Sequence, residues 1–196
     1  MHIWPRLLDH PFYTAWTRGD IPLSVLAGYH RAYGELVRQL PSLWKTVVTA
    51  FRPGDPLGTS VIAEETDHVR LWQLWGKALT PPENTPSLTP LVVELQRMSP
   101  STLLGSLQAF EVQQPEVART KREGLVTHYG FDPATLAYFD EHEKEEEHIR
   151  YGRQLARVNA DPGEFDEGMR RGAALFYRSL DVFVDQDPPT DRRHPS

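Results

Sequence analysis

Helical periodicity is the feature that most constrains this chain. Between its prolines and glycines, apolar residues recur every three or four positions in almost every segment. This spacing places apolar side chains on one face of an α-helix, whereas no segment shows the alternation typical of a β-strand. A serine or aspartate followed by proline marks three helix starts, at residues 99–100, 132–133 and 161–162. The sequence therefore predicts an all-α protein.

The prolines and glycines also divide the chain into separate helices. We expect a single-domain bundle of seven to eight helices within residues 1–185, followed by a disordered tail at residues 186–196. The expected helical segments are 20–51 with a bend at Pro41, 57–79, 87–98, 99–130 with an interruption at Pro115, a helix launched at Asp132 that contains 138–152, and a last helix from Asp161 to near Asp185.

Composition excludes several classes of protein. The net charge is −6 and no basic block stands out, so neither a nucleic acid nor an anionic membrane is an expected partner. No apolar run approaches the roughly 18 residues of a membrane span. The first ten residues lack the features of a signal peptide, so we expect a cytoplasmic location. Because there is no cysteine, a bound metal would need ligands from His, Asp and Glu.

The first candidate ligands lie in "VIAEETDHVRLWQLW", residues 61–75. On a helix, Glu64 and His68 are about 40° apart, and Glu65 and His68 about 60° apart. Leucine and tryptophan continue the same side, so the face is expected to be buried. A buried carboxylate beside an imidazole needs compensation. A metal ion would provide it, and so would a buried hydrogen bond between His68 and a glutamate.

A second candidate is Glu111, a lone acid on the apolar side of the segment "LLGSLQAFEVQQP". It precedes Pro115 by four residues. It could ligate a metal, or it could accept hydrogen bonds from backbone groups that the proline leaves without helical partners.

A third candidate set lies in "YFDEHEKEEEH", residues 138–148. In a continuous helix, His142, Glu145 and His148 would spread over about 120°, and His142 and Glu146 would form a close pair. Such a charged stretch is also typical of a solvated helix face. Spacing alone leaves both interpretations open.

Four segments together show a family resemblance: "HPFYTAWTRGDIPLSVLAGYHRAYGELVRQLP", "AEETDHVRLW", "AFEVQQPEVARTKREGLVTHYG" and "YFDEHEKEEEH". In order and approximate spacing, the chain resembles the haem-oxygenase-like diiron oxidases. This superfamily includes the TenA thiaminases and the PQQ-synthesis oxidase. The resemblance covers most of residues 8–185 and is strongest to the CADD-like branch, named after a chlamydial protein that associates with death domains.

The resemblance implies a helical bundle without haem that holds two irons, with O2 as co-substrate. Manganese would suit the same ligand types. The implied ligands are Glu64, His68, Glu111 as the bridging residue, His142, Glu146 and His148. Glu65 is an alternative to Glu64, and Glu145 is an alternative to Glu146. Two departures from the family pattern stand out. "EETDH" is one uninterrupted turn, whereas the family pattern has a longer insertion between the first Glu and the His. His142 and His148 are six residues apart, whereas the corresponding histidines of the family are seven apart. One of the two irons is therefore expected to be labile.

The CADD-like branch also implies a reaction. Its members are implicated in making 4-aminobenzoate from one of their own tyrosines, with a lysine as amino donor. Tyr13 of "HPFY" and Lys121 of "ARTK" match these places, whereas Gly34 replaces one member of a tyrosine pair. The absence of cysteine argues against the thiaminase branch, which the resemblance says relies on a cysteine nucleophile.

We therefore predict an O2-dependent non-haem diiron oxidase, with a homodimer as a candidate assembly. Its substrate would be a small amino-acid-like or aromatic molecule, a fatty acid, or its own tyrosine. Two alternatives stay open. One is a metal-free helical binding protein on the same scaffold. The other is a cofactorless oxidase or hydrolase, whose activity would survive chelation.

Overall fold

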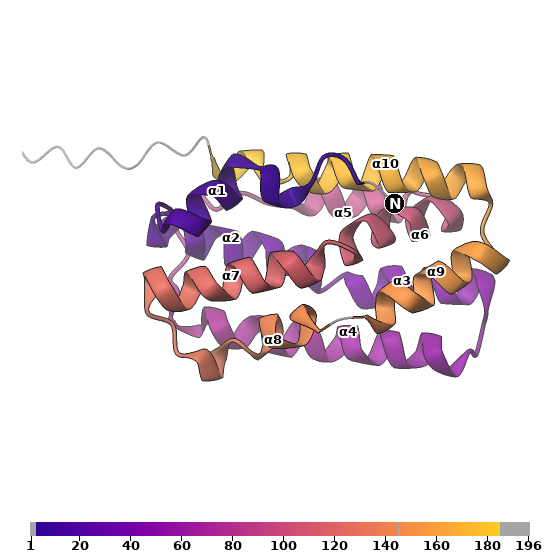
Figure 1. The fold of residues 1–196 in the computed structure, drawn as a ribbon, viewed down its shortest axis with the longest axis horizontal. Coiled ribbons are helices and arrows are strands. Elements are labelled where there is room, and N and C mark those ends of the chain that lie inside the picture. Colours follow the sequence, from indigo (N-terminus) through magenta and orange to yellow (C-terminus); the bar gives the residue numbers. More distant parts are fainter. Residues whose placement is uncertain (1–2, 145, 185–196) are drawn as a thin grey trace, which may run out of the picture.

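The computed structural model describes residues 3–144 and 146–184, which form an elongated helical bundle (Figure 1). Its α-helices are α1 Pro11–Arg18, α2 Leu23–Val37, α3 Leu40–Phe51, α4 Pro56–Trp75, α5 Thr89–Gln96, α6 Pro100–Glu111, α7 Gln114–Tyr129, α8 Ala137–Glu143, α9 Glu147–Val158 and α10 Pro162–Arg178. None of the described residues lies in a β-strand. The all-α prediction is confirmed, and the predicted tail at 186–196 lies outside the described residues.

The helix starts follow the predicted capping chemistry. The Ser99 side chain accepts a hydrogen bond from the backbone of Thr102 at the start of α6, and Asp161 accepts one from Glu164 at the start of α10. Each cap satisfies a backbone N–H that has no partner inside the helix. Asp132 caps in the same way, but it starts only the 3₁₀ turn Pro133–Thr135.

Helices are more numerous than the seven to eight expected, because several predicted helices are divided. Pro41 lies in the first turn of α3, after a break that follows Val37. Pro115 likewise lies in the first turn of α7. A proline ring fits the first turn of a helix but not its interior. The last helix ends at Arg178, and only a 3₁₀ turn, Asp181–Phe183, follows within the described part of the chain.

The prediction of one continuous helix through residues 138–152 is wrong. Helix α8 ends at Glu143 and α9 begins at Glu147. His142 is thus in the last turn of α8, and His148 in the first turn of α9. Helical spacing therefore does not decide how these two side chains lie relative to each other, and the sequence argument based on that spacing loses its basis.

Helix α6 is the most deeply buried part of the bundle, with nearly every side chain from Ser101 to Glu111 covered. Its main neighbour is α10, which runs along one long edge of the bundle, while α4 runs along the opposite edge (Figure 1). The two helices approach closely at Gly105 and Gly168. A Cβ atom on Gly168 would lie 2.1 Å from the carbonyl oxygen of Thr102.

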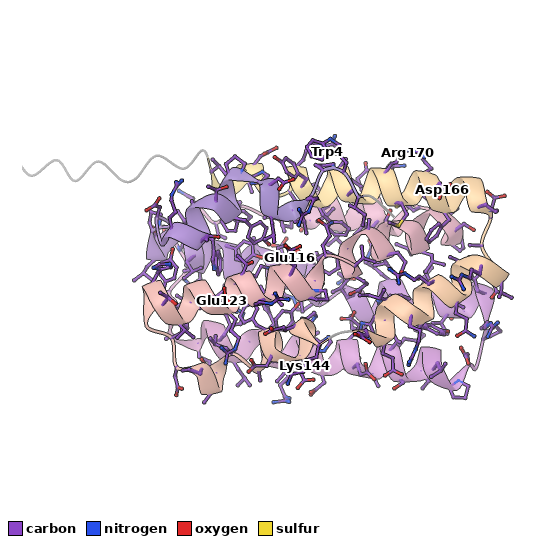
Figure 2. All side chains as sticks on the ribbon, in the orientation of Figure 1. Trp4, Glu116, Glu123, Lys144, Asp166 and Arg170 are labelled. Atoms are coloured by element: carbon purple, nitrogen blue, oxygen red, sulfur yellow. The ribbon has the colours of Figure 1, made fainter. Side chains whose placement is uncertain are left out.

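Side chains fill the space between the helices, and the charged residues Glu123, Asp166 and Arg170 project outward (Figure 2). One cluster of buried apolar residues extends from Leu7 to Phe183 and draws on nearly every helix. Within the described ranges, no helix is both long and apolar enough to cross a lipid bilayer.

Candidate metal centre

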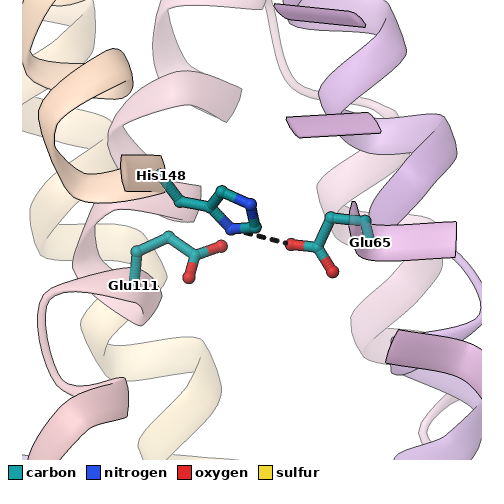
Figure 3. Close-up of side chains that lie close together, drawn as sticks. All are labelled: Glu65, Glu111 and His148. Carbon is teal, nitrogen blue, oxygen red and sulfur yellow. Dashed lines mark ion pairs between the residues drawn. The ribbon is translucent and has the colours of Figure 1, made fainter. Parts of the chain in front are cut away.

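Three helices bring two carboxylates and one imidazole together inside the bundle. Glu65 comes from the middle of α4, Glu111 from the last turn of α6, and His148 from the first turn of α9 (Figure 3). Each is at most 1% exposed. One potential ligand atom from each residue lies within 4.8 Å of the other two. We call these three residues the carboxylate–histidine cluster.

Glu65 lies between two histidines. Its Oε1 atom is 3.4 Å from Nδ1 of His148, and its Oε2 atom is 3.5 Å from Nδ1 of His68. Oε2 is buried and has no hydrogen-bond partner among the described residues. A buried carboxylate held only by such long contacts is poorly compensated for the water it has lost. A cation would compensate it.

Glu64 has a different position from its neighbour. Its side chain is 38% exposed, and its Oε2 atom accepts a hydrogen bond of 3.2 Å from Nε2 of His148. Its Oε1 atom accepts another of 2.9 Å from the hydroxyl of Ser60. When Nε2 of His148 carries the proton, Nδ1 holds the lone pair that a metal would use. Glu64 and Glu65 thus contact opposite sides of the same imidazole.

His68 and His142 extend the cluster. Their ring centroids are 4.3 Å apart, and both side chains are buried. Nδ1 of His142 donates a hydrogen bond of 2.7 Å to the carbonyl oxygen of Tyr138. Burial, and to a lesser degree the nearby His68, hold the pKa of His142 well below its usual value. His142 is therefore a neutral imidazole whose Nε2 is left as the lone-pair atom, which is the form that binds metals.

Of the other predicted ligands, Glu111 belongs to the cluster, whereas Glu146 does not. Glu111 accepts a hydrogen bond of 3.4 Å from Nε1 of Trp44. Glu146 is exposed just before α9, where it lines a surface groove together with Arg150 and Arg153. The structure thus does not bring Glu146 into the carboxylate–histidine cluster. Glu145 lies outside the described residues.

A second group of buried side chains surrounds the amine of Lys121 on α7. Nζ lies 4.8 Å from the ring centroid of Tyr33, 5.3 Å from that of Tyr29 and 5.6 Å from that of Tyr13. Lys121 is only 2% exposed, and burial lowers its pKa from 10.5 to about 7. Burial also raises the pKa of Tyr13. The structure therefore brings both predicted catalytic residues together, in what we call the lysine–tyrosine cluster.

Tyr138 lies beside the carboxylate–histidine cluster and interacts electrostatically with Tyr13 of the lysine–tyrosine cluster. Its ring stacks on His142 with centroids 4.1 Å apart. Its pKa is raised well above the usual value, mainly by burial and further by the negative charges of Glu65 and Glu111. The sequence prediction overlooked Tyr138 and treated Tyr29 and Tyr33 as core residues. The four-residue spacing of Tyr138 and His142, like that of Tyr29 and Tyr33, was the signal that could have revealed them.

Comparison with known proteins finds relatives of this chain by sequence. No family model matches the chain. It is 25% identical over 201 residues to 4-aminobenzoate synthase of Chlamydia trachomatis, covering 92% of this chain and 87% of that protein. The enzyme of the same name from Chlamydia muridarum is 25% identical, with 92% and 85% covered. That from Nitrosomonas europaea is 28% identical over 165 residues, with 70% and 67% covered.

Among solved structures, a TenA homolog from Pseudomonas syringae pv. tomato superimposes with a TM-score of 0.70. It shares 15% of its residues with this chain, and the match covers 92% of this chain and 87% of that one. The fold is therefore TenA-like. The predicted resemblance to the CADD-like branch is also confirmed, because chlamydial 4-aminobenzoate synthases match along nearly the whole chain.

Proposed function

We propose that this chain is an O2-dependent oxidase whose iron is held by the carboxylate–histidine cluster. The observation that carries the proposal is the convergence of Glu65, Glu111 and His148, with ligand atoms within 4.8 Å of one another. The ring of His68 and, beyond it, that of His142 offer imidazoles for a second ion beside the first. Glu65, which contacts both His148 and His68, would be a ligand of this centre.

The side chains fit such a metal. Carboxylate oxygen and imidazole nitrogen are ligands that suit iron and, equally, manganese. Oε2 of Glu65 has no hydrogen bond among the described residues, and a cation would satisfy it. The proposed diiron centre would supply the redox chemistry that activates O2.

The residues around the cluster have distinct roles in this proposal. Glu64 holds the imidazole of His148 so that Nδ1 faces Glu65, and the carbonyl of Tyr138 orients His142 in the same way. Glu64→Gln would weaken iron binding, whereas Glu65→Gln would remove a ligand. Burial of the cluster excludes water from the reacting groups.

The substrate proposed here is an aromatic ring that bears a hydroxyl group. The relatives are named 4-aminobenzoate synthases, and this chain places a buried lysine against three tyrosine rings. At pH 7 about half of the Lys121 amines would be neutral, and the neutral amine is the nucleophilic form of lysine. The tyrosines, with their raised pKa values, stay protonated. The ring would come from Tyr13 or from a bound aromatic molecule.

The test is to load the protein with Fe(II) without oxygen, admit O2 and quantify 4-aminobenzoate by mass spectrometry. Formation of the product without added substrate, together with a mass change in the Tyr13 peptide, would identify the protein's own tyrosine as the source. Lys121→Met should abolish the product, whereas Lys45→Met, at an exposed lysine, should not. Turnover that survives chelation would instead indicate a cofactorless oxidase, and absence of iron uptake by folded protein would indicate a metal-free binding protein.

A further inference from the structure

A separate cavity of about 270 Å³ lies between α6, α9 and α10. Its apolar wall includes Ile3, Val112, Phe165 and Met169. The lining also includes Gln108, Ala156 and two arginines, Arg153 and Arg157, which lie one turn apart on α9. We call this cavity the arginine pocket. None of the residues of the carboxylate–histidine or lysine–tyrosine clusters lines it.

Both arginines are exposed. Arg6, Arg150 and Arg171 each pair with a glutamate, whereas neither Arg153 nor Arg157 makes an ion pair or hydrogen bond with a described residue. Arg153 also lines two adjoining cavities of about 830 and 370 Å³. In a chain with a net charge of −6, two unpaired guanidinium groups beside an apolar cavity form a local site for an anion.

We propose that the arginine pocket binds a small carboxylate with an apolar body. The carboxylate would accept charge-assisted hydrogen bonds from Arg153 and Arg157, whose planar guanidinium groups match carboxylate geometry. The apolar body would lie against Phe165 and Met169, out of water. A cation would be repelled by the arginines, and an inorganic anion would leave the apolar wall exposed to water.

Binding of octanoate and benzoate, measured by calorimetry, tests this proposal with a chain and a ring as the apolar body. At least one should bind the wild-type protein. The double substitution Arg153→Gln with Arg157→Gln should weaken that binding tenfold or more, since it removes both guanidinium groups that donate charge-assisted hydrogen bonds to the carboxylate. The matched control is Arg31→Gln with Arg97→Gln, at exposed arginines outside the pocket that likewise make no ion pair with a described residue, and it should leave the affinity unchanged.

Two further comparisons separate the parts of the pocket. Ala156→Leu places extra carbon atoms in the lining and should weaken binding while circular dichroism stays unchanged. Octanol and octylamine, which lack the carboxylate, should bind much more weakly than octanoate. The proposal is overturned if neither acid binds below about 10 mM, if octanol binds as tightly as octanoate, or if the arginine pair can be replaced without loss. None of these results bears on the metal centre, because the two sites share no residue.

Discussion

Lys121 makes the stability of the metal-free protein depend on pH. Burial lowers its pKa from 10.5 to about 7, so between these values the unfolded chain binds a proton that the folded protein releases. Stability contributed by this group therefore rises with pH across the window. The slope is about 0.7 kcal/mol per pH unit near pH 7, where the folded lysine is half protonated, and approaches about 1.4 above pH 8. From pH 7 to pH 9, the free energy of unfolding should gain about 2 kcal/mol from Lys121 alone.

The assay is urea denaturation of chelator-treated protein at pH 7, 8 and 9. Lys121→Met keeps an unbranched apolar side chain of similar length but has no group that titrates. Its free energy of unfolding should exceed that of the wild type most at pH 7, with the difference shrinking by about 2 kcal/mol at pH 9. Lys45→Met, at an exposed position, should run parallel to the wild type. If Lys121→Met also runs parallel to the wild type, the buried amine does not titrate as argued.

Further substitutions test the packing, a helix cap and the proposed roles of two adjacent glutamates. Gly168→Ala should lower the free energy of unfolding by about 2 kcal/mol or more in urea, because its Cβ would meet backbone of α6 at 2.1 Å. Gly163→Ala, whose nearest neighbour would be a side-chain oxygen at 3.3 Å, should change it by less than about 1 kcal/mol. Asp161→Ala removes the cap of α10 and should cost about 1 kcal/mol by the same measurement. In Fe(II) titrations, Glu64→Gln should weaken affinity about 10- to 100-fold at unchanged stoichiometry, whereas Glu65→Gln should lower the stoichiometry.

Helical periodicity and capping residues were sufficient to predict the fold class and most helix starts. Ser99 and Asp161 act as caps where the sequence indicated, and each proline predicted to interrupt a helix lies in a first turn. These features are local, because a cap or a proline acts on backbone within one turn of itself. Local rules therefore recovered most of the elements, although they missed α1 and underestimated the number of breaks.

The limits of sequence reasoning appear at the end of α8. The charged run continues through residue 148, so periodicity gave no reason to expect that α8 would end at Glu143. Without that break, the six-residue spacing of His142 and His148 looked like a defect in the ligand set. The two histidines instead come from separate helices, and each contacts His68 through ring centroids 4.3 and 6.0 Å apart.

Tertiary packing also distinguishes Glu64 from Glu65, which helical spacing left as alternative ligands. Both lie within one turn of His68, but Glu65 is 1% exposed and Glu64 remains at the edge of the bundle. Which of two neighbouring positions on α4 faces inward depends on how α3, α8 and α9 pack against that helix. Such contacts join residues that are far apart in the chain, so no local pattern reports them.

Anaerobic titration of Fe(II) into the wild type, Glu65→Gln and Glu141→Gln would test the proposed metal centre most directly. Glu141 is exposed on α8 and serves as the matched control. The account predicts up to two irons per wild-type chain, the same number for Glu141→Gln, and a clear loss of iron for Glu65→Gln. Equal iron binding by all three proteins, or no uptake by folded wild type, would contradict it.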